Sequence, residues 1–265
     1  MALIKINYLS QALCKITTVQ VYIPNDLNPD ERRKNPCYDR PMKVLYLLHG
    51  YSGNDTDWIQ GTFVCSLAAK YNFAVVCPSG DNSFYFDQDM TGRKYSSFVG
   101  EELPSYMRKT FGFSRRREDT WIGGLSMGGL GAVCAALKYP QTFSKAIGLS
   151  SAFVINEILT NGKRVTSTET NQAFQDHIYG SLGALKDSEK NPEALLLGLL
   201  DSGNPLPGLY LACGTEDYLL ENNREFRDFL IKQGVPFSYT ESPGEHNWEF
   251  WNQALTPAVR WMIEE

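Results

Sequence analysis

The chain has 265 residues, of which 43% are hydrophobic and 21% are charged, and its 25 Lys and Arg against 30 Asp and Glu give a formal net charge of −5 at pH 7. This composition is typical of a globular protein and excludes disordered, collagen-like and coiled-coil chains. The acidic balance argues against nucleic acid as a partner. No apolar run approaches the ~20 residues that cross a bilayer, so a membrane is not expected as a partner either.

The cysteines and the N-terminus favour a reducing compartment. None of the six cysteines forms a CxxC pair, and Cys77, Cys134 and Cys213 lie in apolar runs. We therefore expect buried free thiols, a cytoplasmic protein and no metal site. Lys5 and Asn7 interrupt any apolar core of a signal peptide, although a secreted chain whose signal had been removed would look the same.

Short apolar runs that end in Gly, Ser or Pro predict the strands. Residues Thr17–Ile23 form a β-branched run that a proline stops, and the polar residues 25–41, with three prolines, predict a surface loop. Nearly continuous apolar runs are typical of strands that are buried on both faces of a parallel sheet. The later runs of this kind are Lys43–Leu48, Phe73–Cys77, Thr120–Gly123, Lys145–Leu149 and Leu209–Cys213.

Helix-like segments alternate with these strands, and the alternation predicts an α/β fold with a mostly parallel central sheet and helices on both faces. We expect one domain over residues 1–265. Residues 154–206 fit the alternation less well and predict a small lid insertion, because about 50 residues rarely build a core of their own. The predicted helices are Thr62–Tyr71, Phe98–Phe111, Gly128–Tyr139, Asn222–Gln233 and Asn247–Glu265, the last kinked or restarted at Pro257.

A GxSxG pentapeptide at Gly124–Gly128 predicts a catalytic serine, Ser126. It lies between the strand Thr120–Gly123 and a helix, which is the strand–turn–helix context that a nucleophile elbow requires. Glycines flank the serine because side chains there would collide with the neighbouring strand and helix. The turn also directs the N–H of Met127 at a developing oxyanion. The alternative is a glycine-rich turn with an incidental serine.

A serine needs a base, and His246 is the best placed of the three histidines. It lies in a turn between a late strand, Phe237–Thr240, and the terminal helix. His49 directly follows a buried strand, and we interpret it as a structural residue that holds the next loop. His177 lies in the predicted lid, where a solvated role is favoured.

The acid should follow the nucleophile and precede the histidine, on a loop at a strand end. Glu216 and Asp217 both satisfy this condition after the strand Leu209–Cys213. The shorter side chain favours Asp217, which would fix the imidazole tautomer and stabilise the imidazolium.

The loop after Lys43–Leu48 should supply the second oxyanion donor, which we assign to the backbone N–H of Tyr51. Aromatic residues near the catalytic loops are candidates for the pocket wall, and we expect Trp58, Tyr85 and Trp248 to contact the substrate. Core packing is the alternative, and it is at least as good an interpretation for Phe153 and Trp251. Phe84 is a further candidate.

Together these motifs resemble the esterase D-like α/β-hydrolases, the group of bacterial tributyrin esterases and acetyl- and feruloyl-esterases. The residues that carry the resemblance are Leu48–Asn54, Trp58, Asp81–Tyr85, Gly124–Gly129, Ala212–Asp217 and His246–Trp251. The resemblance implies an α/β-hydrolase fold and cofactor-free hydrolysis of short-chain acyl, acetyl or feruloyl esters, with Ser126, Asp217 and His246 at the catalytic positions. Relatives often have Asp where this chain has Asn247, which can still cap the following helix.

Several functions remain open on this scaffold. The expected partner is a small-molecule or oligosaccharide ester, and a homo-oligomer is left open. One alternative is a thioesterase of the S-formylglutathione hydrolase type, and another is an acyltransferase that passes the acyl group to a sugar. A non-catalytic binding protein is the third, and the complete set of Ser, Asp and His argues against it.

Overall fold

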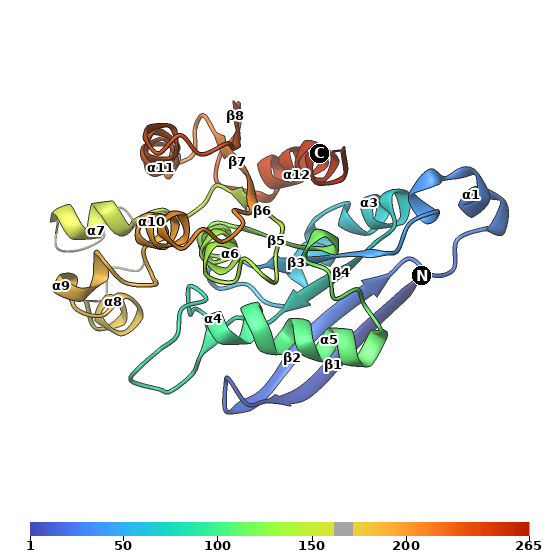
Figure 1. Cartoon of the computed structure of the whole chain (residues 1–265), viewed down its shortest axis with the longest axis horizontal. Coiled ribbons are helices and arrows are strands. Elements are labelled where there is room, and N and C mark those ends of the chain that lie inside the picture. The colour runs from blue at the N-terminus through green and yellow to red at the C-terminus, as the bar shows by residue number, and fades with distance from the viewer. Residues whose placement is uncertain (162–171, 265) are drawn as a thin grey trace.

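The computed structural model describes residues 1–161 and 172–264, and over these residues eight strands form one sheet in the order β1-β2-β4-β3-β5-β6-β7-β8 (Figure 1). The strands are β1 (Ala2–Ser10), β2 (Lys15–Ile23), β3 (Lys43–Leu48), β4 (Phe73–Pro78), β5 (Thr120–Leu125), β6 (Lys145–Leu149), β7 (Gly208–Gly214) and β8 (Ser238–Ser242). Strand β2 pairs antiparallel with β1 and with β4, and every later pair in the order is parallel. The sheet is therefore mixed and mostly parallel, as the apolar runs predict.

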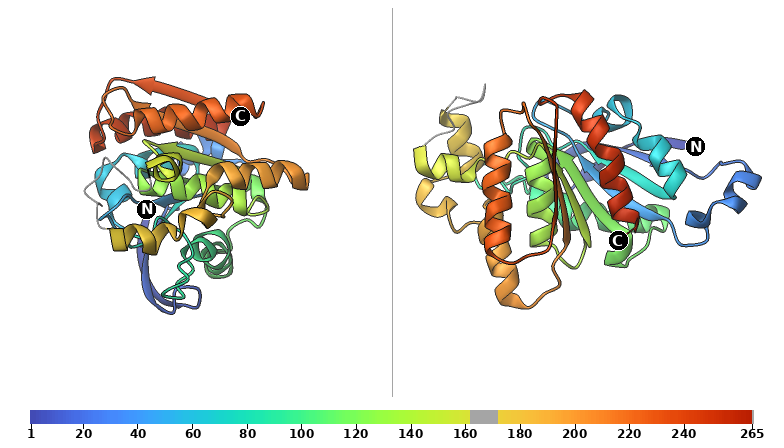
Figure 2. Two further views of the ribbon diagram at one scale, coloured as in Figure 1. Left: turned by 90° about the vertical axis from the view of Figure 1, so that its left-hand side faces the viewer. Right: turned by 90° about the horizontal axis from the view of Figure 1, so that it is seen from above.

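Helices cover both faces of this sheet (Figure 2, right). Helices α3 (Val64–Tyr71) and α12 (Trp248–Glu264) pack in the apolar core of one face, together with the short helix α2 (Asp57–Gly61). The core of the other face contains α5 (Leu103–Phe111), α6 (Met127–Lys138) and α11 (Leu220–Lys232). The strand order and the two-sided cover are those of the α/β-hydrolase fold.

Three expectations about local structure need correction. Residues 25–41 are not simply a loop, because they contain α1 (Pro29–Lys34) and the 3₁₀ turn η1 (Pro36–Tyr38). The side chain of Asn28 accepts the N–H of Asp30, and a proline occupies the first helical position, so the polar segment can begin a helix. Helix α12 continues through Pro257 and does not restart there, whereas the kink expected at this proline stays a prediction. The predicted helix at Phe98 instead starts with α4 (Tyr95–Ser97) and a π-helical turn, η2 (Phe98–Glu102), before α5.

The segment between β6 and β7 contains short helices, in the region where a lid is expected. They are α7 (Ile155–Asn161), α8 (Gln172–Tyr179), α9 (Leu182–Leu185) and α10 (Pro192–Ser202). Helix α10 packs against α6. Residues 162–171 of the expected lid, and the final residue of the predicted terminal helix, lie outside the described residues. The lid and the single domain stay predictions.

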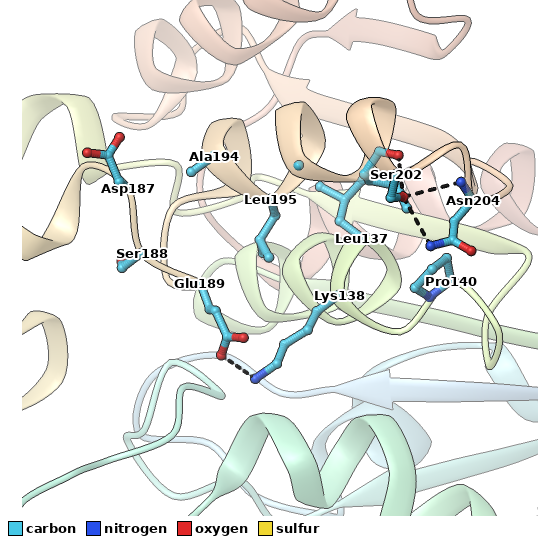
Figure 3. Close-up of a pocket in the computed structure, with 12 residues that line it drawn as sticks. Leu137, Lys138, Pro140, Asp187, Ser188, Glu189, Ala194, Leu195, Ser202 and Asn204 are labelled. Atoms are coloured by element: carbon cyan, nitrogen blue, oxygen red, sulfur yellow. Dashed lines mark hydrogen bonds and ion pairs between the residues drawn. The ribbon is translucent and has the colours of Figure 1, made fainter.

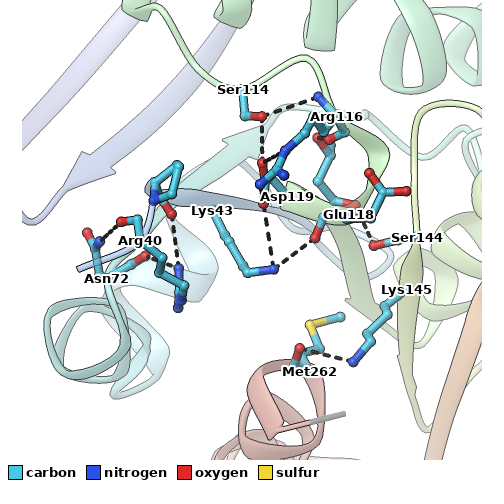
Figure 4. A network of polar contacts seen from close by, with 12 residues as sticks. Arg40, Lys43, Asn72, Ser114, Arg116, Glu118, Asp119, Ser144, Lys145 and Met262 are labelled. Atoms are coloured by element: carbon cyan, nitrogen blue, oxygen red, sulfur yellow. Dashed lines mark hydrogen bonds and ion pairs between the residues drawn. The ribbon is translucent and has the colours of Figure 1, made fainter. Parts of the chain in front are cut away.

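Parallel strands place their carboxyl ends at one edge of the sheet, and the loops after β3, β5, β7 and β8 all leave from that edge. The opposite edge is closed by a polar network around Asp119, at the end of the 3₁₀ turn η3 (Arg117–Asp119) (Figure 4). Asp119 accepts hydrogen bonds from Arg116 Nε at 2.8 Å and Ser114 Oγ at 2.6 Å, and Lys43 Nζ donates to the Glu118 carbonyl at 2.9 Å. The polar groups at this edge bond to one another, whereas at the carboxyl edge Ser126 and His246 line a cavity.

Among the described residues, no helix combines the length and apolar character needed to cross a bilayer. The six cysteines are free, and Cys77, Cys134 and Cys213 are buried, as predicted. Burial raises the pKa of the Cys134 and Cys213 thiols, so both stay protonated and unreactive.

Candidate active site

Three side chains from three different loops meet at the carboxyl edge of the sheet. Ser126 follows β5, Asp217 follows β7, and His246 lies between β8 and α12. His246 Nε2 is 2.9 Å from Ser126 Oγ, and His246 Nδ1 is 2.9 Å from Asp217 Oδ2. A carboxylate only accepts hydrogen bonds, so we assign the imidazole proton to Nδ1, which leaves Nε2 to accept from the serine hydroxyl. The predicted catalytic residues thus lie in one hydrogen-bonded chain.

The turn at Ser126 has the strained geometry that the pentapeptide predicts. Ser126 has φ 54° and ψ −121°, a conformation that costs a non-glycine residue about 1–3 kcal/mol. A Cβ on Gly124 would lie 2.1 Å from the Gly128 carbonyl oxygen, and a Cβ on Gly128 would lie 2.3 Å from that of Leu48. Neither position can accept a side chain, because both close contacts are to backbone atoms.

The two candidate acids have different environments. The side chain of Asp217 is fully buried, and it accepts the Leu219 N–H at 2.8 Å as well as the imidazole. The carboxylate of Glu216 is exposed and bonds to the Gly244 N–H and to the Thr215 hydroxyl. These hydrogen bonds, the one from Gly244 above all, lower the pKa of Glu216. Glu216 therefore links two loops, and the geometry favours Asp217 as the acid.

The loop after β3 approaches the serine turn closely, as an oxyanion donor requires. Leu48 pairs with Gly124 in the sheet, so the two strands end side by side. A Cβ on Gly50 would lie 3.7 Å from Ser126 Cβ. Tyr51 follows Gly50 and lines the same cavity as the serine. Met127 is the first residue of α6, so its N–H has no carbonyl one turn earlier to bond. Tyr51 and Met127 remain our candidates for the two donors.

The buried side chain of His49 holds the loop after β3 in place. Its side chain is 1% exposed, and Nε2 accepts the N–H of Gly80 at 2.8 Å while Nδ1 lies 2.7 Å from the Gly50 carbonyl oxygen. Burial lowers the pKa of His49, so the ring is neutral with its proton on Nδ1. The Tyr85 hydroxyl donates to the His49 carbonyl at 3.2 Å. The structural role predicted for His49 agrees with this arrangement.

Replacing His49 by alanine is expected to destabilise the fold and to slow catalysis. The Gly80 N–H would lose its buried partner, which costs about 1–3 kcal/mol of unfolding free energy. Loosening of the loop should lower kcat on an aryl acetate by about tenfold or more. Urea titration and initial rates measure the two effects. The control is His177→Ala on α8, where a half-buried histidine makes neither of these contacts; equal losses in both variants would contradict the anchoring role.

A cavity of about 440 Å³ opens beside the serine and the histidine. Its lining residues are Gly50, Tyr51, Ser52, Gly53, Asp57, Leu125, Ser126, Tyr218, His246, Trp248 and Trp251. The Trp251 ring meets the His246 ring edge-on at 5.0 Å, and its Nε1 donates to Ser150 Oγ at 3.1 Å. Trp248 packs edge-on against Trp251 at 5.1 Å. The cavity therefore has an aromatic wall next to the imidazole. Trp248 is part of this wall and stays our candidate for a substrate contact.

Two of the predicted substrate contacts need correction, because Trp58 and Tyr85 lie below the cavity rather than in its wall. Trp58 is 1% exposed, and its Nε1 donates to the Leu48 carbonyl at 2.9 Å. Tyr85 is 2% exposed, and its hydroxyl is the one that bonds to His49. Phe84 and Phe153 are also buried in the core. A backbone carbonyl satisfies the polar atom of each of the first two rings, so both can be buried at little cost.

The cavity also contains residues that the sequence reasoning missed. Tyr218 is 54% exposed, and its ring centroid is 4.6 Å from that of His246. Asp57 places a carboxylate in the wall on the side of the oxyanion loop. Each lies one position from a predicted site residue, Asp217 or Trp58. This position next to a predicted site residue was the one feature of the sequence that could have identified them. It does not reveal which way a side chain points.

A second hollow of about 340 Å³ lies between the C-terminal end of α6 and α10 (Figure 3). It shares no lining residue with the cavity at Ser126. Lys138 in its wall pairs with Glu189 at 2.6 Å. Over residues 1–161 and 172–264, no group of three or more His, Cys, Asp or Glu side chains is placed to hold a metal ion.

Comparisons with known proteins show the family to which this chain belongs. The Esterase family model, described as "Putative esterase", matches residues 10–262. An acetyl esterase of Caldicellulosiruptor saccharolyticus is 38% identical over 262 residues, which are 99% of this chain and 98% of that protein. The fluorophosphonate-binding serine hydrolase FphF of Staphylococcus aureus superposes with a TM-score of 0.85 at 30% identity, covering 100% of this chain and 99% of that one. The S-formylglutathione hydrolase FrmB of Staphylococcus aureus superposes with a TM-score of 0.83 at 31% identity, covering 99% and 98%.

Proposed function

Because this chain belongs to the Esterase family of α/β-hydrolases, we propose that it is a serine esterase that hydrolyses short-chain acyl esters, acetyl esters first, through an acyl-enzyme. One observation carries the proposal: the unbroken hydrogen-bonded chain from Ser126 through His246 to Asp217, at the edge of a cavity. The similarity to an acetyl esterase over almost the full length of both chains supports the acetyl group as the acyl part.

The proposed reaction has two acyl-transfer steps. His246 Nε2 takes the proton of Ser126 Oγ as the oxygen attacks the ester carbonyl, and Asp217 stabilises the imidazolium that forms. The N–H groups of Tyr51 and Met127 hold the negative oxygen of the tetrahedral intermediate. His246 then protonates the leaving alcohol, and the acetyl group stays on Ser126. Water attacks this ester by the same route, with His246 as the base, and releases acetate and the free serine.

A substrate panel tests the proposal directly. We expect kcat/KM for p-nitrophenyl acetate to exceed that for p-nitrophenyl ferulate, which has the same leaving group, by about tenfold or more, because a misfitted acyl group loses interactions in the transition state. Acetylated xylan should release acetate, which gives a readout without an activated leaving group. Failure to turn over any acetyl ester, in a protein whose folding is verified by circular dichroism, would refute the esterase assignment.

A thioesterase is the second candidate, and the similarity to the S-formylglutathione hydrolase FrmB favours it. The same three residues would attack a thioester, so the triad does not separate the two functions. The leaving group separates them. A comparison of kcat/KM for S-formylglutathione and for p-nitrophenyl acetate shows which substrate the cavity prefers. The free cysteines support a reducing, cytoplasmic setting for either reaction.

A further inference from the structure

The cavity beside Ser126 carries a negative charge with no cation to balance it. Asp57 lies in its wall, and none of its lining residues is Lys or Arg. Asp57 is half-buried, and within the described residues its carboxylate makes no ion pair and no side-chain hydrogen bond, although its charge acts on the neighbouring His49 ring. A carboxylate that is partly removed from water and left unpaired will act strongly on any charge that enters the same space.

The position of Asp57 places this charge against the oxyanion loop. Asp57 is the first residue of α2, four positions after Gly53. A Cβ on Gly53 would meet the Asp57 Oδ2 atom, and the Gly53 N–H bonds to the Gly50 carbonyl at 3.1 Å. The carboxylate therefore borders the backbone that we expect to hold the reacting carbonyl, and a substituent of the bound ester must pass close to it.

The loops that carry the catalytic residues add further negative charge near Asp57. The four catalytic segments, residues 49–61, 123–131, 214–219 and 242–251, contain no Lys or Arg. They do contain Glu216, Glu245 and Glu249, all exposed beside the triad loops. The charged side chains on the loops that form the site are therefore acidic, which is unfavourable for an anionic substrate that approaches it.

We propose that Asp57 is a specificity-determining residue that disfavours esters with an anionic group and favours neutral, hydroxyl-bearing or cationic alcohols. This inference rests on the proposed esterase function. A hydroxyl group of a sugar-like alcohol can donate a charge-assisted hydrogen bond to the carboxylate. A glutathionyl group carries two carboxylates and one ammonium at neutral pH, so its thioester falls in the disfavoured class.

Three aryl acetates of similar size test this selection: 4-acetoxybenzamide (neutral), 4-acetoxybenzoate (anionic) and 4-acetoxyphenyl-trimethylammonium (cationic). Asp57→Asn should raise the ratio of kcat/KM for the anion to that for the neutral ester by about fivefold, and it should lower the cation-to-neutral ratio by a similar factor. Asp57→Glu, which keeps the charge, should retain the wild-type ratios. Comparing ratios between variants cancels the intrinsic reactivity of each ester.

Two further measurements complete the test. Asp187→Asn removes one charge at the second hollow of Figure 3 and should leave the ratios unchanged. In the wild type, raising the ionic strength from about 0.01 M to about 0.5 M should raise the ratio of kcat/KM for the anionic ester to that for the neutral ester, because salt screens the carboxylate. This measurement needs no variant. Ratios that are insensitive both to Asp57→Asn and to salt overturn the inference, while turnover of the neutral ester leaves the esterase function intact. If the wild type hydrolyses none of the three aryl acetates, both the esterase function and the role of Asp57 are refuted.

Discussion

Substitution of Ser126 by alanine is expected to lower kcat for p-nitrophenyl acetate by about 10⁴-fold or more, to the residual level that binding and the oxyanion donors supply alone. The physical reason is the loss of the one oxygen that lies 2.9 Å from His246 Nε2 and can form the acyl-enzyme. The fold should persist, because removing the hydroxyl adds no atom to the tight turn and leaves its backbone contacts in place. Initial rates and thermal unfolding measure the two properties.

A covalent probe separates the loss of a nucleophile from general damage to the site. A fluorophosphonate should form a bond from its phosphorus to Ser126 Oγ with release of fluoride, and intact-mass spectrometry should detect one adduct on the wild type and none on Ser126→Ala. Ser202→Ala, at the end of α10 in the second hollow, is the matched control and should label and turn over normally. Retention of most of the activity in Ser126→Ala would show that another group is the nucleophile.

The second large effect is expected at Asp217. Replacing it with asparagine should lower kcat by about 10⁴-fold, because an amide no longer holds the imidazole proton on Nδ1 or stabilises the imidazolium. The buried carboxylate accepts both the imidazole and the Leu219 N–H, and asparagine can keep the second of these contacts, so the loop should stay folded. Rates at several pH values and the fluorophosphonate labelling rate measure the loss.

Glu216→Gln is the matched control for Asp217→Asn, since both change one acid to its amide on the same loop. We expect it to lower kcat by less than about threefold, because Glu216 is exposed and bonds to Gly244 rather than to His246. A larger loss in Glu216→Gln than in Asp217→Asn would move the acid by one position and would contradict the geometry of the site.

The elbow and the order of the catalytic residues were accessible to sequence reasoning because they depend on local rules. Glycines at positions 124 and 128 reflect backbone contacts within one strand–turn–helix unit, which a pentapeptide reveals. A run that is buried on both faces is also visible as continuous apolar residues, as in β3 and β5. The short helix α1 was missed because its caps, Asn28 and Asn35, are polar residues that occur equally often in loops.

The lining of the cavity could not be predicted in the same way. Trp58 and Trp248 are both tryptophans near a catalytic loop, yet one is buried against the Leu48 carbonyl and the other lines the cavity. Their rings pack edge-on with centroids 5.9 Å apart, so a core residue and a residue of the cavity wall are direct neighbours. No periodicity in either loop reports this difference, because an irregular loop has no repeating face.

From the order of its residues alone, this chain could be assigned its fold class, its family and the three residues of its candidate triad, since each depends on motifs within a few residues or on chain order. The tertiary structure supplied the hydrogen bonds that distinguish Asp217 from Glu216. It also showed that Trp58 and Tyr85 lie in the core and that Asp57 lines the cavity. These outcomes depend on which surfaces meet when distant segments pack, and that is set by the whole fold.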